Sequence, residues 1–283
     1  MGRHATIRGE LRRGRHERTM TRKARHLFIG LGAIVVPIVL LVGGAIGVAA
    51  AWPEEPMPDF RAYEAGPDRK TEFFEFVRPL VAAENERIRR DRERLTDIVA
   101  RSAHGWFDRW WLSFLAQEYR IDEASLSEDE VVETLLRRVD VVPMSLALAQ
   151  AAKESGWGTS RFARDGNNLF GEWCFDSGCG IVPQNRAQGR RHEVEAFSSP
   201  RDSVISYLRN LNTHDRYHAF RIERARLRET GSDLSGWRLA EELTGYSERR
   251  DDYVEDIQSL IRVNKLADEV APLEKQPSPD AGG

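Results

Sequence analysis

Residues 143–171 constrain the fold more than any other part of the chain, and they read PMSLALAQAAKESGWGTSRFARDGNNLFG. A proline at the first position of a helix loses no hydrogen bond, and nearly all of residues 144–154 are good helix formers. We therefore predict a helix that opens at Pro143. The glycine of Ser155-Gly156 can take the left-handed conformation that ends a helix. One face of this helix then carries Leu146, Ala147, Gln150, Ala151 and Glu154.

Glu154 is placed unusually for a glutamate. The C-terminal end of a helix carries partial negative charge, which disfavours a carboxylate there. Burial beside Trp157 would disfavour the ionised form further, and both effects raise a carboxyl pKa. A carboxyl that stays protonated near neutral pH is what a glycosidase uses as its general acid. The alternative is a solvated surface residue in the last turn of an ordinary amphipathic helix.

The residues after Glu154 favour the first interpretation. Residues 156–158 (GWG) form a tight aromatic turn, and residues 167–171 (NNLFG) supply two amides ahead of a second such turn. The whole stretch AQAAKESGWGTSRFARDGNNLFG resembles the signature of bacterial peptidoglycan β-N-acetylglucosaminidases of the autolysin and flagellar-rod type. A longer match over residues 73–266 resembles the Bax branch of that family.

The resemblance implies a fold and a reaction. The fold is α+β: a mainly helical, lysozyme-like domain around a groove, with a small β lobe on one side. The implied activity is that of an endo-β-N-acetylglucosaminidase, which cuts the glycan strand of peptidoglycan after N-acetylglucosamine. Glu154 matches the catalytic acid of the family. No cofactor is implied.

Further site residues come from the same resemblance. Tyr246 is similar to the tyrosine that family members place near the cleaved bond. Asn167 and Asn168 are suited to bracing the turn after the helix, because asparagine favours such backbone roles. The candidate substrate-binding residues are Gln150, Trp157, Asn168 and Phe170.

The second carboxylate is where the sequence departs from the family. Autolysin-type relatives supply it from the β lobe, and the alignment puts residues 180–182, which carry no acid, at that place. Asp176, Glu193 and Glu195 are nearby substitutes, and Glu193 is our candidate. If none reaches the groove, the acetamido group of the sugar would act as the nucleophile.

Two other functions stay open. A muramidase or lytic transglycosylase on the same fold would also use one glutamate but would cut after N-acetylmuramic acid. A non-catalytic wall-binding protein would keep the fold and lose the activity. A metal site is not predicted: His214 and His218 are four residues apart but lack the glutamate of the zinc-protease motif and a third ligand.

The N-terminal part of the sequence predicts a membrane anchor. Residues 1–26 are rich in arginine, and residues 27–51 contain no charge, which is long enough to cross a bilayer. The basic flank stays in the cytoplasm, so the rest of the chain is predicted to lie in the periplasm as a single-pass inner-membrane protein. The alternative is a signal peptide cleaved before Trp52. A start of translation at Met20 would favour this alternative, because it leaves only a short basic region before the apolar run.

Beyond the anchor, residues 52–70 are rich in proline and glycine and are predicted to be a linker. Residues 71–142 form the helical first part of the domain, residues 143–268 its glucosaminidase core, and residues 269–283 a disordered tail. Residues 52–283 hold 33 basic against 43 acidic side chains, which disfavours nucleic-acid binding. The partners are then peptidoglycan and, through residues 27–51, the membrane; the sequence predicts no oligomeric state.

Apolar periodicity predicts five further helices, at residues 71–102, 131–138, 202–212, 221–228 and 251–268. Between the first two lie four aromatic residues: Trp106, Phe107, Trp110 and Trp111. We predict that they pack between helices, because aromatic burial dominates core energetics; stacking on sugar faces is the alternative.

Residues 173–197 are predicted to form the small β lobe, the wall of the groove that faces Glu154. Their periodicity is poor and glycines punctuate them. Cys174 and Cys179 are the only cysteines and enclose a short turn, so in an exported chain we predict a disulfide between them.

Overall fold

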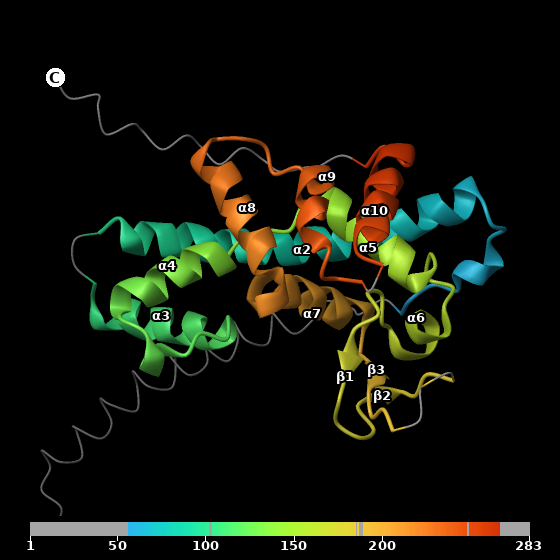
Figure 1. Cartoon of the computed structure of the whole chain (residues 1–283), viewed down its shortest axis with the longest axis horizontal. Coiled ribbons are helices and arrows are strands. Elements are labelled where there is room, and N and C mark those ends of the chain that lie inside the picture. The colour runs from blue at the N-terminus through green and yellow to red at the C-terminus, as the bar shows by residue number, and fades with distance from the viewer. Residues whose placement is uncertain (1–55, 102–103, 185, 187–188, 248, 267–283) are drawn as a thin grey trace, which may run out of the picture. The chain divides into compact units, whose positions relative to one another are not determined.

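Helix α5 (Met144–Ser155) is the centre of the fold (Figure 1), and ten of its residues are buried. It packs against the helices α2 (Pro67–Val99), α9 (Gly236–Leu239) and α10 (Asp251–Val263). Its small residues allow these close approaches. At Gly236 of α9, a Cβ atom would lie 2.2 Å from Ser145 Oγ and 2.8 Å from the backbone nitrogen of Leu146.

The computed structural model describes residues 56–101, 104–184, 186, 189–247 and 249–266. The chain divides into two compact units, residues 1–53 and 54–283, and all that follows concerns the second. The predicted cytoplasmic segment 1–26, the apolar run 27–51 and the tail 269–283 lie outside the described residues. Within the described ranges, no helix is both long and apolar enough to cross a membrane.

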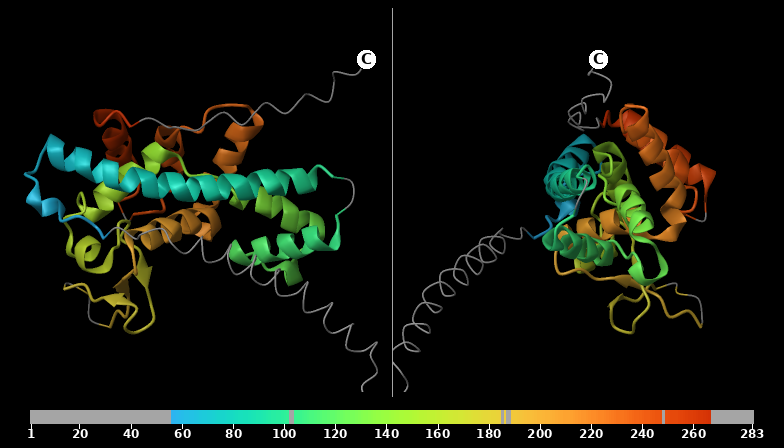
Figure 2. Two further views of the ribbon diagram at one scale, coloured as in Figure 1. Left: turned by 180° about the vertical axis from the view of Figure 1, so that it is seen from behind. Right: turned by 90° about the vertical axis from the view of Figure 1, so that its left-hand side faces the viewer.

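The helix predicted at residues 71–102 is α2, which begins at Pro67 and ends at Val99. Figure 2 shows it from behind, and it contacts α4 (Glu128–Arg138), α5 and α7 (Pro200–Thr213). The apolar positions at helical spacing turn toward the core of the unit. The fully buried ones are Phe73, Val77, Val81, Ile88, Leu95 and Ile98.

Helix α3 (Trp106–Glu118) corrects the prediction for the four aromatic residues. Trp111 is buried at 7% exposure, as core packing requires. Trp106, Phe107 and Trp110 instead keep 51% or more of their surface exposed. The reason is geometric: the buried face of α3 runs through Leu112, Leu115 and Ala116 with Trp111 at its edge, and the other three rings lie outside that face, where no helix of the described residues covers them.

The remaining predicted helices are present with small changes in their ends. Residues 131–138 belong to α4, which starts earlier because Ser127 and Glu130 form a capping box. The others are α7, α8 (His218–Glu229) and α10, which ends at Val263. Short 3₁₀ turns complete the helical part at Phe60–Ala62, Glu123–Ser125, Asp215–Tyr217 and Ala240–Leu243.

The β lobe follows the short helix α6 (Arg161–Gly166) and has three strands: β1 (Trp173–Cys174), β2 (Gly180–Ile181) and β3 (Glu193–Glu195). Their order is β1-β3-β2, and β3 pairs antiparallel with both neighbours. The predicted disulfide joins Cys174 and Cys179 across the β1–β2 loop. A mainly helical fold with a small sheet confirms the predicted α+β class.

A buried ionic cluster fixes the turn that leads into α5. Asp140 is 2% exposed, and Arg228 donates to both of its carboxylate oxygens, at 3.2 and 2.8 Å. Arg92 of α2 and Arg224 of α8 lie 3.6 and 3.8 Å from the same carboxylate. Burial opposes ionisation, but these three arginines outweigh it and lower the pKa of Asp140 to about 2. The cluster thereby joins α2, α8 and the start of α5.

The turn after α5 is built from three consecutive residues in the left-handed region. Their φ values are 57° at Gly156, 59° at Trp157 and 72° at Gly158. At Gly158 a Cβ atom would lie 2.3 Å from a ring carbon of Phe60, which is fully buried. The GWG sequence therefore meets both a conformational and a packing requirement.

Candidate active site

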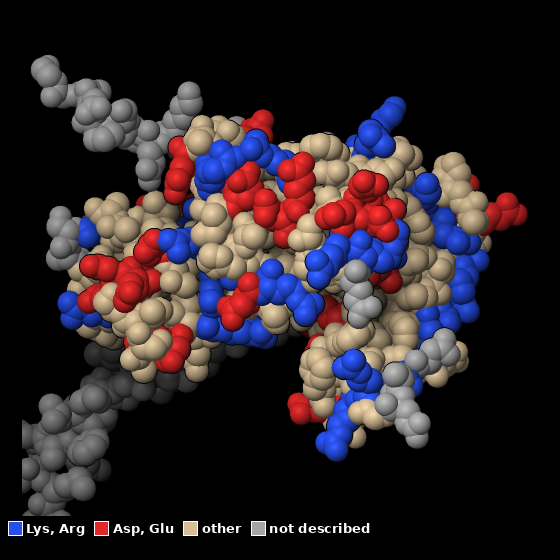
Figure 3. Space-filling model, viewed as in Figure 1, with Lys and Arg blue, Asp and Glu red and all other residues tan. Residues whose placement is uncertain are grey.

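Glu154 is the residue before the last in α5 and is half-buried, at the end of the helix nearest the β lobe. Figure 3 shows the surface hollowed where this lobe projects from the helices. Burial raises the pKa of the Glu154 carboxyl, and the Tyr253 hydrogen bond and the charge of Lys153 only partly oppose that rise. The neighbouring Lys153 is itself paired with Asp256 at 2.8 Å.

A chain of hydrogen bonds holds the Glu154 carboxyl in place. The Tyr207 hydroxyl donates to Gln150 Oε1 at 2.6 Å, and Gln150 Nε2 donates to the Tyr253 hydroxyl oxygen at 2.9 Å. Tyr253 in turn hydrogen-bonds to the Glu154 side chain. Because every step uses the donor or acceptor that the next group needs, Tyr253 presents its proton to Glu154.

Four of the six tyrosines in the chain surround this position: Tyr207, Tyr217, Tyr246 and Tyr253. Burial raises the pKa of each hydroxyl, and the charge of Glu154 adds to that rise. All four therefore remain neutral hydrogen-bonding groups at physiological pH. The Tyr246 ring stacks on Tyr253 at 5.3 Å, and its hydroxyl donates to the Phe170 carbonyl at 3.0 Å. Tyr246, which the resemblance places near the cleaved bond, thus packs on the tyrosine that hydrogen-bonds to Glu154.

The loop after α6 closes over Glu154 with a glycine. Gly171 has φ 66°, and a Cβ atom there would lie 3.6 Å from Glu154 Oε2. Asn168 sets this loop: its Nδ2 donates to the carbonyls of Glu172 and Glu195, and its Oδ1 accepts from the amides of Phe170 and Glu172. Asn167, with φ 51°, donates to the Phe197 carbonyl. Both asparagines brace the turn, as the sequence predicts.

Three predicted substrate-binding residues are buried behind the site. Gln150 is 0%, Asn168 1% and Phe170 1% exposed. The Phe170 ring stacks on Tyr207 with the planes 3° apart and the centroids 3.8 Å apart. Substrate contact does not fit these placements, because the polar atoms of the two amides bond to protein groups. Periodicity places a residue on a helix face but does not show which side chains cover that face.

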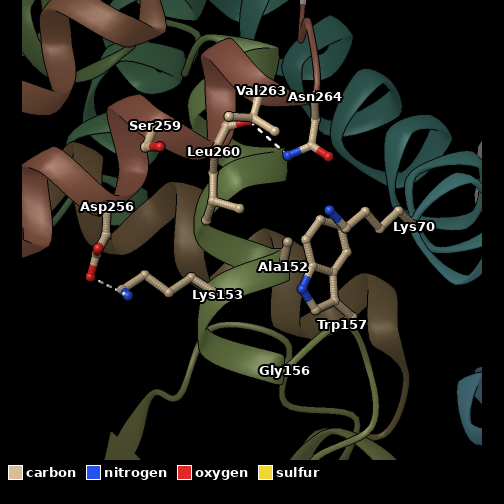
Figure 4. A pocket seen from close by; sticks show the side chains of 10 residues that line it. All are labelled: Lys70, Ala152, Lys153, Gly156, Trp157, Asp256, Ser259, Leu260, Val263 and Asn264. Carbon is tan, nitrogen blue, oxygen red and sulfur yellow. Dashed lines mark hydrogen bonds and ion pairs between the residues drawn. The ribbon is translucent and has the colours of Figure 1, made fainter. Parts of the chain in front are cut away.

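Trp157 packs away from these tyrosines. Its ring meets Phe73 and Phe74 edge-on, and Lys70 Nζ lies 5.1 Å from its centroid. Figure 4 shows that Trp157, Lys70 and Lys153 line a pocket between α5, α10 and the start of α2. Glu154 is not one of the residues that line this pocket. A subsite role for Trp157 would therefore lie in this second hollow.

Glu193 is engaged inside the β lobe. Its two carboxylate oxygens accept hydrogen bonds from the amides of Gly178 and Gly180, at 3.2 and 2.9 Å. These bonds lower its pKa. Glu193 thus holds the disulfide-closed loop against β3, and a role as the second carboxylate finds no support in this arrangement. Asp176, a further substitute, is exposed on the same loop.

Two other glutamates lie on the side of the site that faces α7, and sequence reasoning missed the first. Glu172 has a buried Oε2 atom without a hydrogen-bond partner among the described residues. Burial raises its pKa to about 7, with a smaller contribution from the charge of Glu195, against opposing effects of Ser206, Asn210 and Arg120. Burial also raises the pKa of Glu195. The sequence signal that could have identified Glu172 is its position directly after Phe170-Gly171 of the motif.

The arrangement can donate a proton but is not built for a metal. Glu154 is a half-buried carboxyl beside neutral hydroxyl groups. Among the described residues, no group of three or more His, Cys, Asp or Glu side chains is placed to hold a metal ion. His214 caps a 3₁₀ turn by accepting from the Arg216 amide, and His218 starts α8.

Comparison with known proteins finds similarity over most of the described region. Residues 130–266 match the Glucosaminidase family model, described as mannosyl-glycoprotein endo-beta-N-acetylglucosaminidase. The chain is 35% identical over 197 residues to Protein bax of Escherichia coli K12, which covers 70% of each chain. No solved structure matches.

Proposed function

The chain belongs to the Bax branch of the bacterial glucosaminidase family, and from that premise we propose that it is an endo-β-N-acetylglucosaminidase of peptidoglycan. Family membership by itself supports a peptidoglycan-related glycoside hydrolase. The finer statement is that the enzyme, on a lysozyme-like domain, cuts the glycan strand after N-acetylglucosamine. The observation that carries acid-catalysed cleavage is Glu154, which is half-buried, has a raised pKa and receives a hydrogen bond from Tyr253. The choice of N-acetylglucosamine is supported by the description of the matching family model.

In the proposed reaction, Glu154 gives its proton to the departing glycosidic oxygen. Tyr253 and Gln150 keep its carboxyl oriented, and the Tyr246 ring supports Tyr253 by stacking on it. The missing side chain at Gly171 leaves room for the glycan next to the Glu154 oxygen. After bond cleavage, the Glu154 carboxylate can accept a proton from the attacking water, by microscopic reversibility.

For the second catalytic group we favour the acetamido group of the substrate. Its carbonyl oxygen would attack the anomeric carbon while Glu154 protonates the leaving oxygen, and water would then open the resulting ring. Support comes from the carboxylates themselves. Glu193 is occupied by backbone amides, and burial disfavours the anionic forms of Glu172 and Glu195. A nucleophilic carboxylate must be ionised and free.

Digestion of purified sacculi, with product identification by mass spectrometry, tests the specificity. New reducing N-acetylglucosamine ends are the expected result. A 1,6-anhydro-muramic end would identify a lytic transglycosylase, and a reducing muramic end a muramidase. Intact sacculi after long incubation would favour a non-catalytic wall-binding protein.

Glu172→Gln and Glu193→Gln test the second group separately. If the acetamido group is the nucleophile, each variant should keep activity within about tenfold of wild type. A loss of two or more orders of magnitude in either variant, with the fold intact, would assign the nucleophile or base to that carboxylate.

A further inference from the structure

Helix α3 exposes a row of four aromatic rings. Trp106 is 81%, Phe107 51%, Trp110 57% and Phe114 53% exposed, whereas most large apolar side chains of this unit are buried. An exposed apolar patch of this kind on a folded domain marks a binding surface. Helix α3 also lies before residues 130–266, so the match to the family model does not cover it.

The rings are ordered relative to one another. Phe107 and Trp110 stack with their planes 30° apart, and Trp110 and Phe114 with theirs 21° apart. Arg94 of α2 lies 5.5 Å from the Phe107 ring and 4.3 Å from Trp111, which ties the base of the row to the core. The row is therefore a preformed aromatic platform, and binding to it costs little side-chain entropy.

A groove runs beside this platform. Besides Trp110 and Phe114, its lining includes Ser113, Gln117, Asp122 and Glu123. The lining contains no lysine or arginine. Ser113 Oγ donates to Glu123 Oε2 at 2.6 Å, and the Ala124 amide donates to Asp122 Oδ1 at 3.2 Å. One oxygen of each carboxylate and the Gln117 amide are left to face a ligand. Flat rings next to neutral and acidic hydrogen-bonding groups suit a ligand with apolar faces and many hydroxyl or amide hydrogens.

The platform also leads toward the candidate active site. The groove lining includes Ile121, which follows Arg120 in the chain, and the charge of Arg120 acts on both Glu172 and Glu195. Arg209 of α7 donates to the carbonyl of Glu118, the last residue of α3, at 3.1 and 2.8 Å. The end of α3 is thus held against α7, the helix whose Ser206 and Asn210 act on Glu172. The aromatic platform and the candidate active site are therefore connected through α7.

We propose that this aromatic platform is a glycan-binding site that holds part of the peptidoglycan strand outside the catalytic groove. Sugar rings would stack on Trp110 and Phe114, while Gln117, Asp122 and Glu123 accept or donate hydrogen bonds to hydroxyl and acetamido groups. The proposal rests on the proposed function for its substrate. An anionic lipid surface fits less well, because the groove offers carboxylates and no cation.

Co-sedimentation with purified sacculi tests the platform. The full-length chain carries Glu154→Gln so that the sacculi stay intact during the assay. Adding Trp110→Ala with Phe114→Ala should weaken binding at least about tenfold, because two stacking surfaces are lost. Trp110→Tyr with Phe114 unchanged should keep most of the wild-type affinity, because both positions still carry a ring. Trp237→Ala is the matched control, since this exposed tryptophan lies on α9.

The outcomes separate this proposal from its alternatives. Unchanged sacculus binding in the double alanine variant would overturn it. It would also fall if ring loss instead reduced binding to phosphatidylglycerol–phosphatidylethanolamine vesicles, or abolished self-association in analytical ultracentrifugation. If the wild-type chain digests sacculi but the double alanine variant binds them normally, the proposed function stands and the glycan-binding platform is disproved. If the double alanine variant loses sacculus binding but the wild-type chain does not digest sacculi, the proposed enzymatic function is refuted and the glycan-binding site is retained.

Discussion

At the scale of single residues, the environment of Glu154 explains why a glutamate occurs at the end of a buried helix. Its carboxyl is desolvated, receives a hydrogen bond from Tyr253 and faces a glycine rather than a side chain. Desolvation favours the neutral acid, and the hydrogen bond orients it. A surface glutamate would need none of these features.

Glu154→Gln should lower glycan cleavage by about 10²–10⁴-fold with little change in the unfolding midpoint, because glutamine keeps the shape but has no proton to give. In the wild type, activity should fall on the alkaline side as Glu154 ionises, at a pH above that of an ordinary glutamate. The matched control is Glu229→Gln, an exposed glutamate that ends α8. Equal activity of the two variants would exclude Glu154 as the acid.

Glu172 makes a separate prediction about stability. Its pKa is about 7 in the fold, whereas an unfolded chain releases this proton near the ordinary value of 4.5. Between these values the folded state holds the extra proton, so stability should fall as the pH rises and then level off above pH 7. Glu172→Gln should remove that fall.

Urea unfolding at pH 4.5 and pH 8 measures the effect, with the exposed Glu241→Gln as the control. The difference between the two pH values should shrink in Glu172→Gln and persist in Glu241→Gln. If both variants keep the wild-type difference, Glu172 is not a buried acid.

The sequence predicts single residues unevenly. Glu154 and Tyr246 are predicted as site residues because they belong to a fixed motif and its family, and the structure brings both next to Tyr253. Gln150 and Phe170 were predicted as substrate-binding residues from the same resemblance, but buried tyrosines cover both. Glu172 was missed because its environment comes from α7, about 35 residues later, and no local pattern contains that contact.

At the scale of elements, the turn after α5 has the most demanding geometry. Gly158→Ala would bring a methyl group into the buried Phe60 ring and force a side chain into φ 72°. We expect a loss of about 3 kcal/mol in the free energy of unfolding. Gly178→Ala shares the strained backbone, with φ 83°, but meets no atom within 4 Å.

The control variant Gly178→Ala should therefore lose only about 1 kcal/mol. Equilibrium urea unfolding distinguishes the two costs. Equal losses would mean that the contact between this turn and Phe60 contributes nothing, and that only the left-handed backbone matters.

Most helices follow from periodicity, and the exception is instructive. The patterns of α2, α4, α7, α8 and α10 alternate apolar and charged faces, so their existence and inward faces are readable. Helix α3 has aromatic rings beside its buried aliphatic residues, and a pattern of this kind cannot show where the buried face ends. The small sheet is built from strands of two or three residues, too short for a period to appear.

At the scale of the whole molecule, acid stability should depend on the Asp140 cluster. The pKa of Asp140 is about 2 in the fold against 3.8 without its partners. Its contribution is present above pH 3.8 and is lost as the pH falls toward 2; it amounts to roughly 2 kcal/mol.

Asp140→Asn should cost about 3–5 kcal/mol at pH 7, because it leaves buried arginine charge unpaired. It should also flatten the loss of stability below pH 4. Asp215→Asn is the control, since Asp215 is 98% exposed and makes one long contact with Arg138. Chemical unfolding between pH 2.5 and 7 checks both variants, and matching curves would remove the cluster from this role.

Location is the other property of the whole molecule, and we propose that residues 52–283 lie outside the cytoplasmic membrane. The support is the uncharged run 27–51 with its arginine-rich N-terminal flank. A reporter that works only outside the cytoplasm should give signal when fused after Gly283. Activity of a cytoplasmic reporter there would exclude export, and a mature N-terminus at Trp52 would replace the anchor by a cleaved signal.

The Asp140 cluster also delays the final packing of the start of α5 while the chain is being synthesised. Its arginines on α8 follow Asp140 by 84 and 88 positions in the chain, so the start of α5 cannot be locked until residue 228 has left the ribosome. At about 5–20 residues per second, this interval is roughly 4–18 s. Non-local closure of this kind also slows folding in general. During that time the turn that leads into the helix carrying Glu154 lacks its contacts with α8, and the helix is accessible to chaperones and proteases.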